Sequence, residues 1–284
     1  MKVLIIGGVA AGTKTAAKLK RERPDAEVML VTKGKNISYA GCGLPYYIGE
    51  VIKEKEALIV NTPEKFADLT GTKVVTETEI TEVNPESKTV KAVKSDGTVD
   101  KYEYDKLVIA TGASPIKPPL EGIDLPGVFC VRTPEDAFAI KDYIKEHNCE
   151  RAAVIGGGFI GLEVAENLRK MDLRVSVIDM ADQVMPGFSK DFADFFEEHL
   201  SSIGIKVLTG RKVESIQGTE RPEKVITDKK GVKADIVVLS IGIRANTAFL
   251  EGTGIELMPN RTIKVNEYME TNIADIYAVG DCVT

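Results

Sequence analysis

Short apolar runs divide the chain into two similar series of elements. The runs 2–6 (KVLII) and 152–155 (AAVI) have the continuous apolar character of buried strands. Each is followed by a glycine-rich segment and then by an amphipathic stretch, which ends near Arg21 in the first series and near Lys170 in the second. A buried strand, a tight turn and a helix in this order are typical of α/β proteins with parallel sheets. The pattern therefore predicts two α/β units in one chain.

Alternating and β-branched residues predict further strands in both halves. Asp96-Gly97 marks a hairpin turn, and Thr62-Pro63 and Thr133-Pro134 each place an N-cap before a proline at the start of a helix. A last short strand ends at Gly280-Asp281. The other strands that we expect are 27–31, 73–76, 79–83, 89–93, 99–102 and 106–110 in the first half, and 174–178, 206–208, 224–227, 235–241 and 262–265 in the second.

The first glycine-rich segment is Gly7-Gly8-Val9-Ala10-Ala11-Gly12. Glycines there allow a tight turn, and the N–H groups at the start of the following helix can bind a pyrophosphate, as in Rossmann-like units. The segment departs from G-x-G-x-x-G at Val9, and Thr32 stands where a carboxylate usually contacts a ribose. A dinucleotide site and a glycine-rich turn without a ligand are both compatible with this segment.

The second segment, Gly156-Gly157-Gly158-Phe159-Ile160-Gly161, meets every position of G-x-G-x-x-G. Asp179 ends the following strand, at the distance where a carboxylate can accept hydrogen bonds from both ribose hydroxyls. A 2′-phosphate there would meet a negative charge. We therefore expect this unit to bind NAD(H) in preference to NADP(H). A structural unit without a nucleotide is the alternative.

Cys42 lies between Gly41 and Gly43, just before Pro45, a residue that suits the first turn of a helix. A thiol at the start of a helix is near the positive end of the helix dipole and near free N–H groups, which favour the thiolate. Cys42 is therefore a candidate redox or nucleophilic centre. A small inert residue in a tight turn is the other interpretation.

Composition excludes several classes of protein. With 284 residues, 43% hydrophobic residues and a net charge of -6, the chain is typical of a globular protein of two domains and not of a nucleic-acid-binding surface. No apolar run is long enough to cross a bilayer, and the first strand begins without a signal peptide, so we expect no membrane partner and a cytoplasmic location. Cys42, Cys130, Cys149 and Cys282 lack the spacing of zinc ligands. We therefore expect no metal site and no structural disulfide.

Four features occur in a fixed order: a glycine-rich turn after the first strand, the single Cys42, a complete G-x-G-x-x-G motif, and Gly280-Asp281. Together with Ala110-Thr111-Gly112, they make the chain resemble the pyridine nucleotide–disulfide oxidoreductases. In that family the first unit binds FAD, the second binds NAD(P)H, and the A-T-G and G-D motifs flank the flavin. The resemblance covers essentially the whole chain. It implies two Rossmann-like dinucleotide-binding domains of the three-layer β/β/α type, one inserted in the other.

The resemblance assigns site residues to both cofactors, and it implies roles for two of them. Phe159 is expected to cover the flavin until the nicotinamide displaces it. Glu163, one helical turn further, is expected to orient the nicotinamide amide, with a charge on the helix surface as the alternative. The residues assigned to FAD are Gly7, Gly8, Ala10, Ala11, Gly12, Thr32, Lys33, Ser38, Ala110, Thr111, Gly112, Gly280 and Asp281. Those assigned to NADH are Gly156, Gly158, Phe159, Ile160, Gly161, Glu163, Asp179 and Gly242.

Cys42 has no partner in a C-x-x-x-x-C pair, because Ile37 and Tyr47 occupy those positions. A single thiol must cycle through a mixed disulfide, a persulfide or a sulfenic acid. The chain thus resembles the single-cysteine subgroup, which contains coenzyme A-disulfide reductases, polysulfide or persulfide reductases, NADH oxidases and NADH peroxidases. In the peroxidases and water-forming oxidases a histidine occupies the position of Ala10.

The absence of this histidine favours an FAD-dependent NADH oxidoreductase that reduces coenzyme A disulfide, or a related di-, per- or polysulfide, through Cys42. The alternatives are an NADH oxidase or peroxidase that cycles Cys42 as a sulfenic acid, and a flavin-binding electron carrier or non-catalytic fragment. The family's coenzyme A phosphates lie over the region of Lys18, Arg21 and Ser38. A solvated basic face, which also includes Lys14, is the other interpretation of the first helix.

The prolines at 115, 118, 119 and 126 place a domain boundary after the first strand series. We expect an FAD-binding domain from residues 1–115 and 242–284 and an NAD(H)-binding domain from residues 116–241. Relatives continue past the G-D motif with a helix and a dimerisation domain, and full-length relatives are homodimeric. The chain stops shortly after Asp281, so the resemblance leads us to expect a truncated form.

Overall fold

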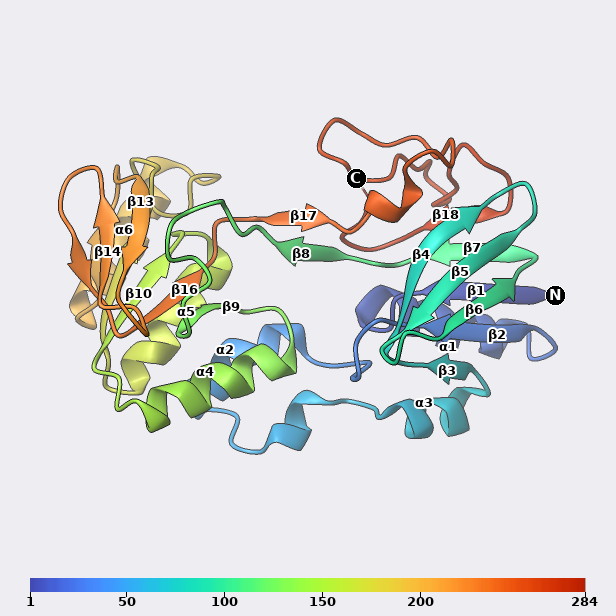
Figure 1. The fold of residues 1–284 in the computed structure, drawn as a ribbon, viewed down its shortest axis with the longest axis horizontal. Coiled ribbons are helices and arrows are strands. Elements are labelled where there is room, and N and C mark those ends of the chain that lie inside the picture. Colours follow the sequence, from blue (N-terminus) through green and yellow to red (C-terminus); the bar gives the residue numbers. More distant parts are fainter. Residues whose placement is uncertain (284) are drawn as a thin grey trace. The chain divides into compact units, whose positions relative to one another are not determined.

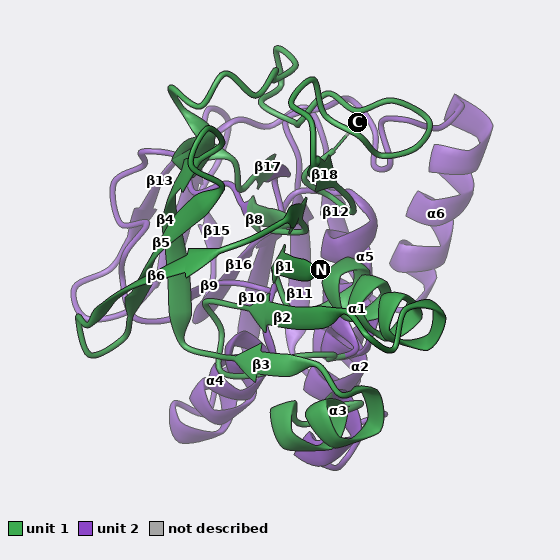
Figure 2. Cartoon of the chain, turned by 90° about the vertical axis from the view of Figure 1, so that its right-hand side faces the viewer, with its two compact units in different colours: residues 1–39, 59–114, 244–284 green, residues 40–58, 115–243 purple. Residues whose placement is uncertain are grey.

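The computed structural model describes residues 1–283 and divides the chain into two compact units, coloured separately in Figure 2. The first unit consists of residues 1–39, 59–114 and 244 onward, and the second consists of residues 40–58 and 115–243. The cuts near residues 114 and 243 fall within the short paired strands β8 (Ala113–Pro115) and β17 (Ile243–Ala245).

The first unit is built on a parallel sheet of five strands in the order β18-β7-β1-β2-β3 (Figure 1). An antiparallel sheet of three strands, β4-β5-β6, forms a second layer, and helices α1 and α3 belong to a third. The bounds are β1 Lys2–Ile6, α1 Ala10–Glu22, β2 Glu27–Val31, α3 Pro63–Thr70, β3 Lys73–Val75, β4 Thr78–Asn84, β5 Thr89–Lys94, β6 Val99–Glu103, β7 Lys106–Ile109, the 3-10 turn η3 Ala248–Leu250, and β18 Ile276–Ala278.

Alternation along β1 shows why this unit has three layers. Val3 and Ile5 point to the helix side, where they pack in one cluster with Ala16 of α1 and Phe66 of α3. Leu4 and Ile6 belong to a different cluster, which contains the inner residues of β4 and β5. Because successive side chains of a strand point to opposite faces, a strand that is apolar throughout needs a covering layer on each side.

The second unit repeats this architecture. Its parallel sheet has the order β12-β11-β10-β16-β9, and its antiparallel sheet has the order β13-β14-β15. The bounds are the 3-10 turn η1 Gly41–Gly43, α2 Leu44–Ile48, the 3-10 turn η2 Lys55–Leu58, β9 Val128–Cys130, α4 Pro134–Glu146, β10 Arg151–Ile155, α5 Phe159–Lys170, β11 Arg174–Ile178, α6 Lys190–Ser202, β12 Lys206–Leu208, β13 Val213–Gln217, β14 Lys224–Thr227, β15 Val232–Lys233 and β16 Ile236–Leu239. The prediction of two Rossmann-like three-layer β/β/α domains is confirmed.

Both predicted helix caps are confirmed. The Thr62 side chain accepts a hydrogen bond from the amide of Lys65, and Thr133 forms a reciprocal capping box with Asp136. The strand expected at 262–265 is wrong. Ile263 takes part only in isolated bridges, with Leu257 and with Val283, and its side chain is buried in the cluster that also contains Leu4 and Ile6 of β1.

The expected domain ranges need one correction. The expected boundaries, after residues 115 and 241, lie close to the observed cuts, but residues 40–58 belong to the second unit and not to the first. The reason is hydrophobic packing, since Leu44, Tyr47, Ile48 and Leu58 are buried in the core on the helix side of the second unit. Residue 284, the last of the expected range 242–284, lies outside the described residues.

Candidate functional site

The two glycine-rich turns have the same backbone geometry. Gly7 has φ +113° and Gly156 has φ +111°, in a region that other residues rarely adopt. A Cβ at Gly7 would collide with the carbonyl oxygen of Ala110, and one at Gly156 would collide with that of Ser240. Glycine is therefore required for each turn to pack against the neighbouring strand end. No side chain caps the starts of α1 and α5, so their first N–H groups can bind an anion.

The two units differ at the residue that follows the first strand after the glycine turn and its helix, β2 in the first unit and β11 in the second. In the second unit the amide of Gly157 donates to Asp179 Oδ2 (2.6 Å), and the amide of Ala181 donates to Oδ1 (2.8 Å). A carboxylate accepts about four hydrogen bonds, so both oxygens retain capacity for ribose hydroxyls. In the first unit the buried Thr32 takes this place beside Gly8, and it offers one hydroxyl and no charge.

Gly158, the middle glycine of the second G-x-G-x-x-G motif, has space around it. A Cβ at Gly158 would have no atom within 4 Å, and its φ of −83° suits any residue. The fold therefore does not require glycine there. A backbone without a side chain at this point is what close approach of a pyrophosphate requires.

The A-T-G segment is held by a residue that the sequence did not reveal. Asn246 Nδ2 donates to the carbonyl oxygen of Thr111 (3.0 Å), and Ser114 donates to Asn246 Oδ1 (2.8 Å). The backbone of Asn246 takes part as well. Thr111 Oγ1 donates to the carbonyl oxygen of Asn246, and the backbone N–H of Asn246 donates to the carbonyl oxygen of Gly112. Asn246 thus fixes Ala110–Gly112 from a position far along the chain, where no local pattern could point to it.

The G-D segment lies beside the first glycine turn. A Cβ at Gly280, whose φ is +81°, would lie 2.9 Å from the Cβ of Ala11, and Asp281 is exposed. The amide of Ser38 donates to the carbonyl oxygen of Gly8 (2.8 Å), which places Ser38 at the same turn. The first unit thus assembles the glycine turn, Ser38 and the G-D segment at the carboxyl ends of its parallel strands, the usual place for a ligand in α/β folds.

Two of the predicted basic residues already have acidic partners. Lys33 Nζ lies 3.0 Å from Glu79 Oε1, and Lys18 Nζ lies 2.5 Å from Glu22 Oε1. These pairs are exposed, and such pairs are weak enough for an anionic ligand to compete with them. Arg21 is exposed at the end of α1, and Ala10 is exposed at its start.

Phe159 begins α5 and is 64% exposed. Its ring packs edge-to-face on Phe188, with centroids 5.7 Å apart. Ile160 is also exposed, and Glu163 is half-buried one turn later. Gly242 accepts a hydrogen bond from the amide of Ile116 through its carbonyl oxygen.

Cys42 is exposed within η1, whereas Cys130, Cys149 and Cys282 are partly or fully buried. Burial raises the pKa of each of these three thiols, that of Cys149 to about 11. Cys42 is therefore the accessible thiol of the four. The expected helix after it is present but has only five residues, so few aligned peptide groups contribute to its dipole. The dipole argument for the thiolate is correspondingly weak.

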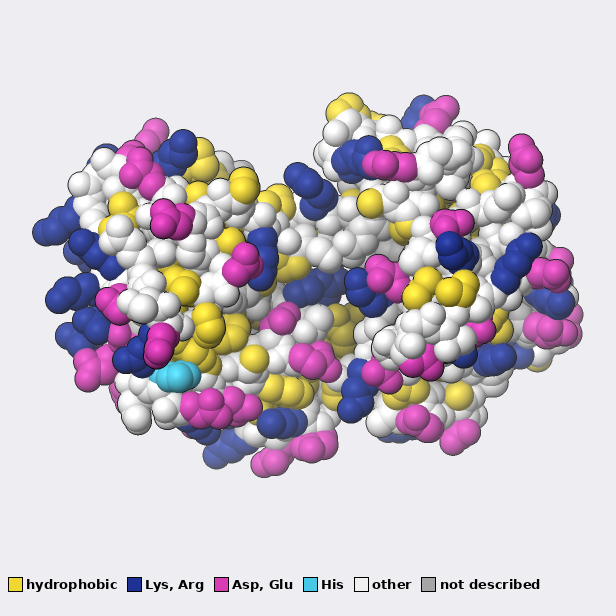
Figure 3. All heavy atoms as spheres, viewed as in Figure 1, with side chains coloured by type: hydrophobic (Ala, Val, Ile, Leu, Met, Phe, Trp, Pro, Cys, Tyr) yellow, Lys and Arg dark blue, Asp and Glu magenta, His cyan; other side chains and the backbone are white. Residues whose placement is uncertain are grey.

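Charge is mixed on the face that Figure 3 shows, where basic and acidic side chains are interspersed over both units. Within residues 1–283, no helix has the length and hydropathy needed to cross a bilayer. Among the same residues, no three His, Cys, Asp or Glu side chains are grouped as metal ligands.

A family model described as "Pyridine nucleotide-disulphide oxidoreductase" matches residues 1–284, so the chain belongs to this family, as the motifs predicted. The chain is 42% identical to an NADH oxidase of Methanocaldococcus jannaschii, over 100% of this chain and 63% of that protein. It is 39% identical to an NAD(P)H sulfur oxidoreductase (CoA-dependent) of Pyrococcus furiosus, over 99% of this chain and 62% of that protein. A solved NAD-dependent persulfide reductase from A. fulgidus matches with a TM-score of 0.96 and 41% identity, over 100% of this chain and 53% of that one. The chain thus spans less than two thirds of the length of these relatives.

Proposed function

We propose that the chain is the dinucleotide-binding part of an FAD- and NADH-dependent reductase of coenzyme A disulfide, or of a related small di-, per- or polysulfide. Cys42 is its redox thiol. The observation that carries this proposal is the combination of two glycine turns of equal geometry with one exposed cysteine between two glycines. Relatives named NADH oxidase, sulfur oxidoreductase and coenzyme A disulfide reductase support the class of reaction.

The residues present fit both cofactors. In the first unit the start of α1, the Ala110–Gly112 segment and the Gly280-Asp281 segment would hold FAD, with Thr32 and Ser38 at the same strand ends. In the second unit the start of α5 would hold the pyrophosphate of NADH, and Asp179 would hold its adenosine ribose. The open space at Gly158 and the remaining acceptor capacity of Asp179 are the structural support for this assignment. Bound NADH and FAD supply the electron pair for the reaction.

Cys42 acts as the nucleophile in this proposal. Its thiolate attacks one sulfur of the disulfide, which forms a mixed disulfide and releases the other sulfur as a thiolate. Two electrons and a proton then reduce the mixed disulfide, release the second thiol and restore the Cys42 thiolate. The sum consumes one NADH and one proton for each disulfide and yields two thiols and NAD⁺. Lys18, Arg21 and Ser38 would contact the coenzyme A part of the substrate.

An NADH oxidase or peroxidase is the second candidate, because the relative from Methanocaldococcus jannaschii carries the name NADH oxidase. In that case Cys42 would cycle as a sulfenic acid. The position where the peroxidases and water-forming oxidases carry a histidine holds Ala10, whose methyl group cannot transfer a proton. This difference favours the disulfide substrate.

Anaerobic titration of the FAD-loaded chain with NADH tests the proposal. If Cys42 is a second redox centre, reduction consumes more NADH than the flavin alone accepts, and a long-wavelength charge-transfer band appears. Cys42→Ser should lose disulfide reduction and retain NADH-to-flavin reduction, whereas Cys130→Ala should retain both. Wild-type turnover of coenzyme A disulfide by Cys42→Ser would contradict the mechanism. Faster NADH consumption with oxygen or peroxide than with any disulfide would favour the second candidate.

We also propose that the protein works in a reducing compartment, the cytoplasm, because an exposed reactive thiol has to be kept from uncontrolled oxidation. The family resemblance further implies a homodimer for full-length forms. Sedimentation of this chain beside a longer relative would test that part.

A further inference from the structure

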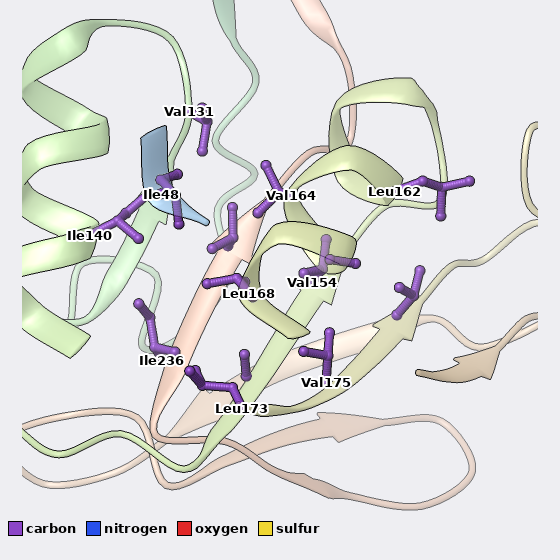
Figure 4. Close-up of a cluster of buried hydrophobic side chains, with 14 of the residues drawn as sticks. Ile48, Val131, Ile140, Val154, Leu162, Val164, Leu168, Leu173, Val175 and Ile236 are labelled. Atoms are coloured by element: carbon purple, nitrogen blue, oxygen red, sulfur yellow. The ribbon is translucent and has the colours of Figure 1, made fainter. Parts of the chain in front are cut away.

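The short helix α2, which follows Cys42, packs into the core of the second unit. In α2, Leu44, Tyr47 and Ile48 are each at most 3% exposed. Figure 4 shows Ile48 beside Ile140 of α4, and both belong to a cluster that also contains residues of α5. Helices α4 and α5 therefore determine where α2 lies.

Lys141, on α4, adds a charged group to this buried region. Only 7% of the residue is exposed. Its Nζ lies 4.5 Å from the centre of the Tyr47 ring and 3.3 Å from Oε1 of Glu50. Lys145, one turn later, reaches the same Oε1 at 3.4 Å, but 58% of its side chain is exposed. Because a buried ammonium group is costly unless it is paired, Lys141 favours the arrangement in which Tyr47 and Glu50 stay beside it.

The end of α2 also packs closely on α5. Gly49 has a φ of −80°, which suits any residue, yet a Cβ there would lie 2.8 Å from the Cβ of Asn167. Asn167 is 1% exposed, and its Nδ2 donates to the carbonyl oxygen of Glu163 (2.8 Å), so it cannot move away easily. The short helix is thus held by a polar tether to α4 and by close packing on α5.

We propose that Lys141 is a positioning residue for Cys42. The thiol belongs to η1, which runs directly into α2. The amide of Gly43 donates to the carbonyl oxygen of Ala40, and the amide of Leu44 donates to the carbonyl oxygen of Gly41. The 3-10 turn η1 and the helix α2 are therefore joined by continuous backbone hydrogen bonds. Holding α2 through Tyr47 and Glu50 therefore limits the positions that the thiol can take. The inference rests on the proposed function only in taking Cys42 as the reacting thiol.

The test uses Lys141→Met, which keeps most of the apolar stem and removes the charge. Its matched controls are Lys141→Arg, which keeps the charge, and Lys145→Met, which removes the exposed partner of Glu50. Hydrogen exchange of residues 44–50 is followed by mass spectrometry in the full chain, with peptides of β10 as the internal reference. We expect Lys141→Met to accelerate exchange in 44–50 by about tenfold or more, and both controls to change it by less than about threefold, with β10 unchanged.

Alkylation of Cys42 by iodoacetamide gives the second readout, because it reports on the thiol itself. We expect Lys141→Met to change its rate constant by more than about threefold, since the positions of the thiol are no longer restricted, and Lys141→Arg to restore the wild-type rate. Gly49→Ala, which forces α2 away from Asn167, should accelerate exchange in 44–50 as well.

Unchanged exchange of 44–50 in Lys141→Met would overturn the proposal. An equal acceleration in β10 would also overturn it, because Lys141 would then support the whole unit and not α2. If Lys141→Met does not fold, Glu50→Gln decides, since it removes the charged partner and should accelerate exchange in 44–50. These measurements need no turnover. A chain in which Cys42→Ser still reduces disulfides would therefore refute the proposed function without affecting the tether.

Discussion

The amide nitrogen of Gly157 lies 2.6 Å from Oδ2 of Asp179, so the carboxylate both braces the glycine turn of the second unit and faces the proposed nucleotide site. In the first unit the corresponding pair is Gly8 and Thr32: a Cβ at Gly8 would lie 3.1 Å from the Cβ of the buried threonine, whose side chain carries no charge. The two turns share one backbone geometry and differ in charge. This difference accounts for the assignment of NADH to the second unit and predicts how the two sites respond to substitution.

Asp179→Ser should weaken NADH binding by roughly 10- to 100-fold, because hydrogen bonds to a charged group contribute about 1.5–3 kcal/mol. Binding of NADPH should weaken less, since the substitution also removes the repulsion of the 2′-phosphate. Fluorescence titration of the chain with both nucleotides measures the two dissociation constants. Asp182→Asn, an exposed carboxylate nearby, is the control and should change neither constant.

Gly156→Ala and Gly158→Ala should separate folding from binding in one motif. The first should destabilise the second unit by at least about 2 kcal/mol, since its positive φ and the nearby Ser240 carbonyl both exclude a side chain. The second should cost less than about 1 kcal/mol, the typical range for an N-cap change, and yet weaken NADH binding at least about tenfold. Thermal unfolding and nucleotide titration measure the two effects. If Gly158→Ala bound NADH as tightly as the wild type, the proposal that the pyrophosphate is bound at this turn would be contradicted.

Asn246→Ala should loosen the A-T-G segment. It removes the bonds to the carbonyl oxygen of Thr111 and to Ser114, at a cost of about 1–2 kcal/mol. Because this segment is proposed to flank the flavin, FAD should dissociate faster from the variant, as followed by the recovery of free-flavin fluorescence. Ser114→Ala loses only one of these bonds and should have a smaller effect. Equal rates for both variants would show that Asn246 has no special role.

Asp275 should give the first unit an acid-sensitive contribution to stability. Hydrogen bonds from Lys106 and Lys88 lower the pKa of Asp275 from its ordinary value of 3.8 to about 2. Because the folded-state pKa is the lower one, this contribution is fully present above the ordinary pKa and disappears as the pH falls from about 4 to about 2. Asparagine tolerates the positive φ of this residue, +69°, so Asp275→Asn changes mainly the charge.

Urea midpoints of the wild type and of Asp275→Asn should therefore differ at pH 6 and converge towards pH 2. Glu256→Gln, which breaks the exposed pair with Lys264, provides the comparison for an ion pair with a single partner. A difference between wild type and Asp275→Asn that stays constant over this range would mean that the two lysines do not stabilise the carboxylate.

Local patterns identified many of the elements because their causes are local. The strand 27–31 is found at its predicted bounds, and so is the strand 174–178. A capping threonine followed by a proline fixes the start of α3 and of α4, and each of these signals lies within four consecutive residues. The strand expected at 262–265 is absent, because Ile263 is buried and Val265 partly buried without forming a strand ladder, and periodicity reports burial and not hydrogen bonding.

Other features depend on residues far apart in the sequence. Asn246 reaches a segment 135 residues earlier, and no spacing rule connects the two. The segment that carries Cys42 was expected in the first domain by its place in the chain, but its apolar residues are buried in the second unit. Lys141 has the sequence context of an ordinary helix-surface lysine, and only its packing against Tyr47 and Glu50 distinguishes it.

The sequence by itself determined the two dinucleotide-binding units, their glycine turns and Cys42 as the redox candidate, since these follow from backbone sterics and from the types of residue present. The tertiary structure decided which unit carries Cys42, what fixes the A-T-G segment and which lysine is buried. The physical reason is that burial and pairing depend on the three-dimensional neighbours of a side chain, and those neighbours come from parts of the chain that no local pattern relates.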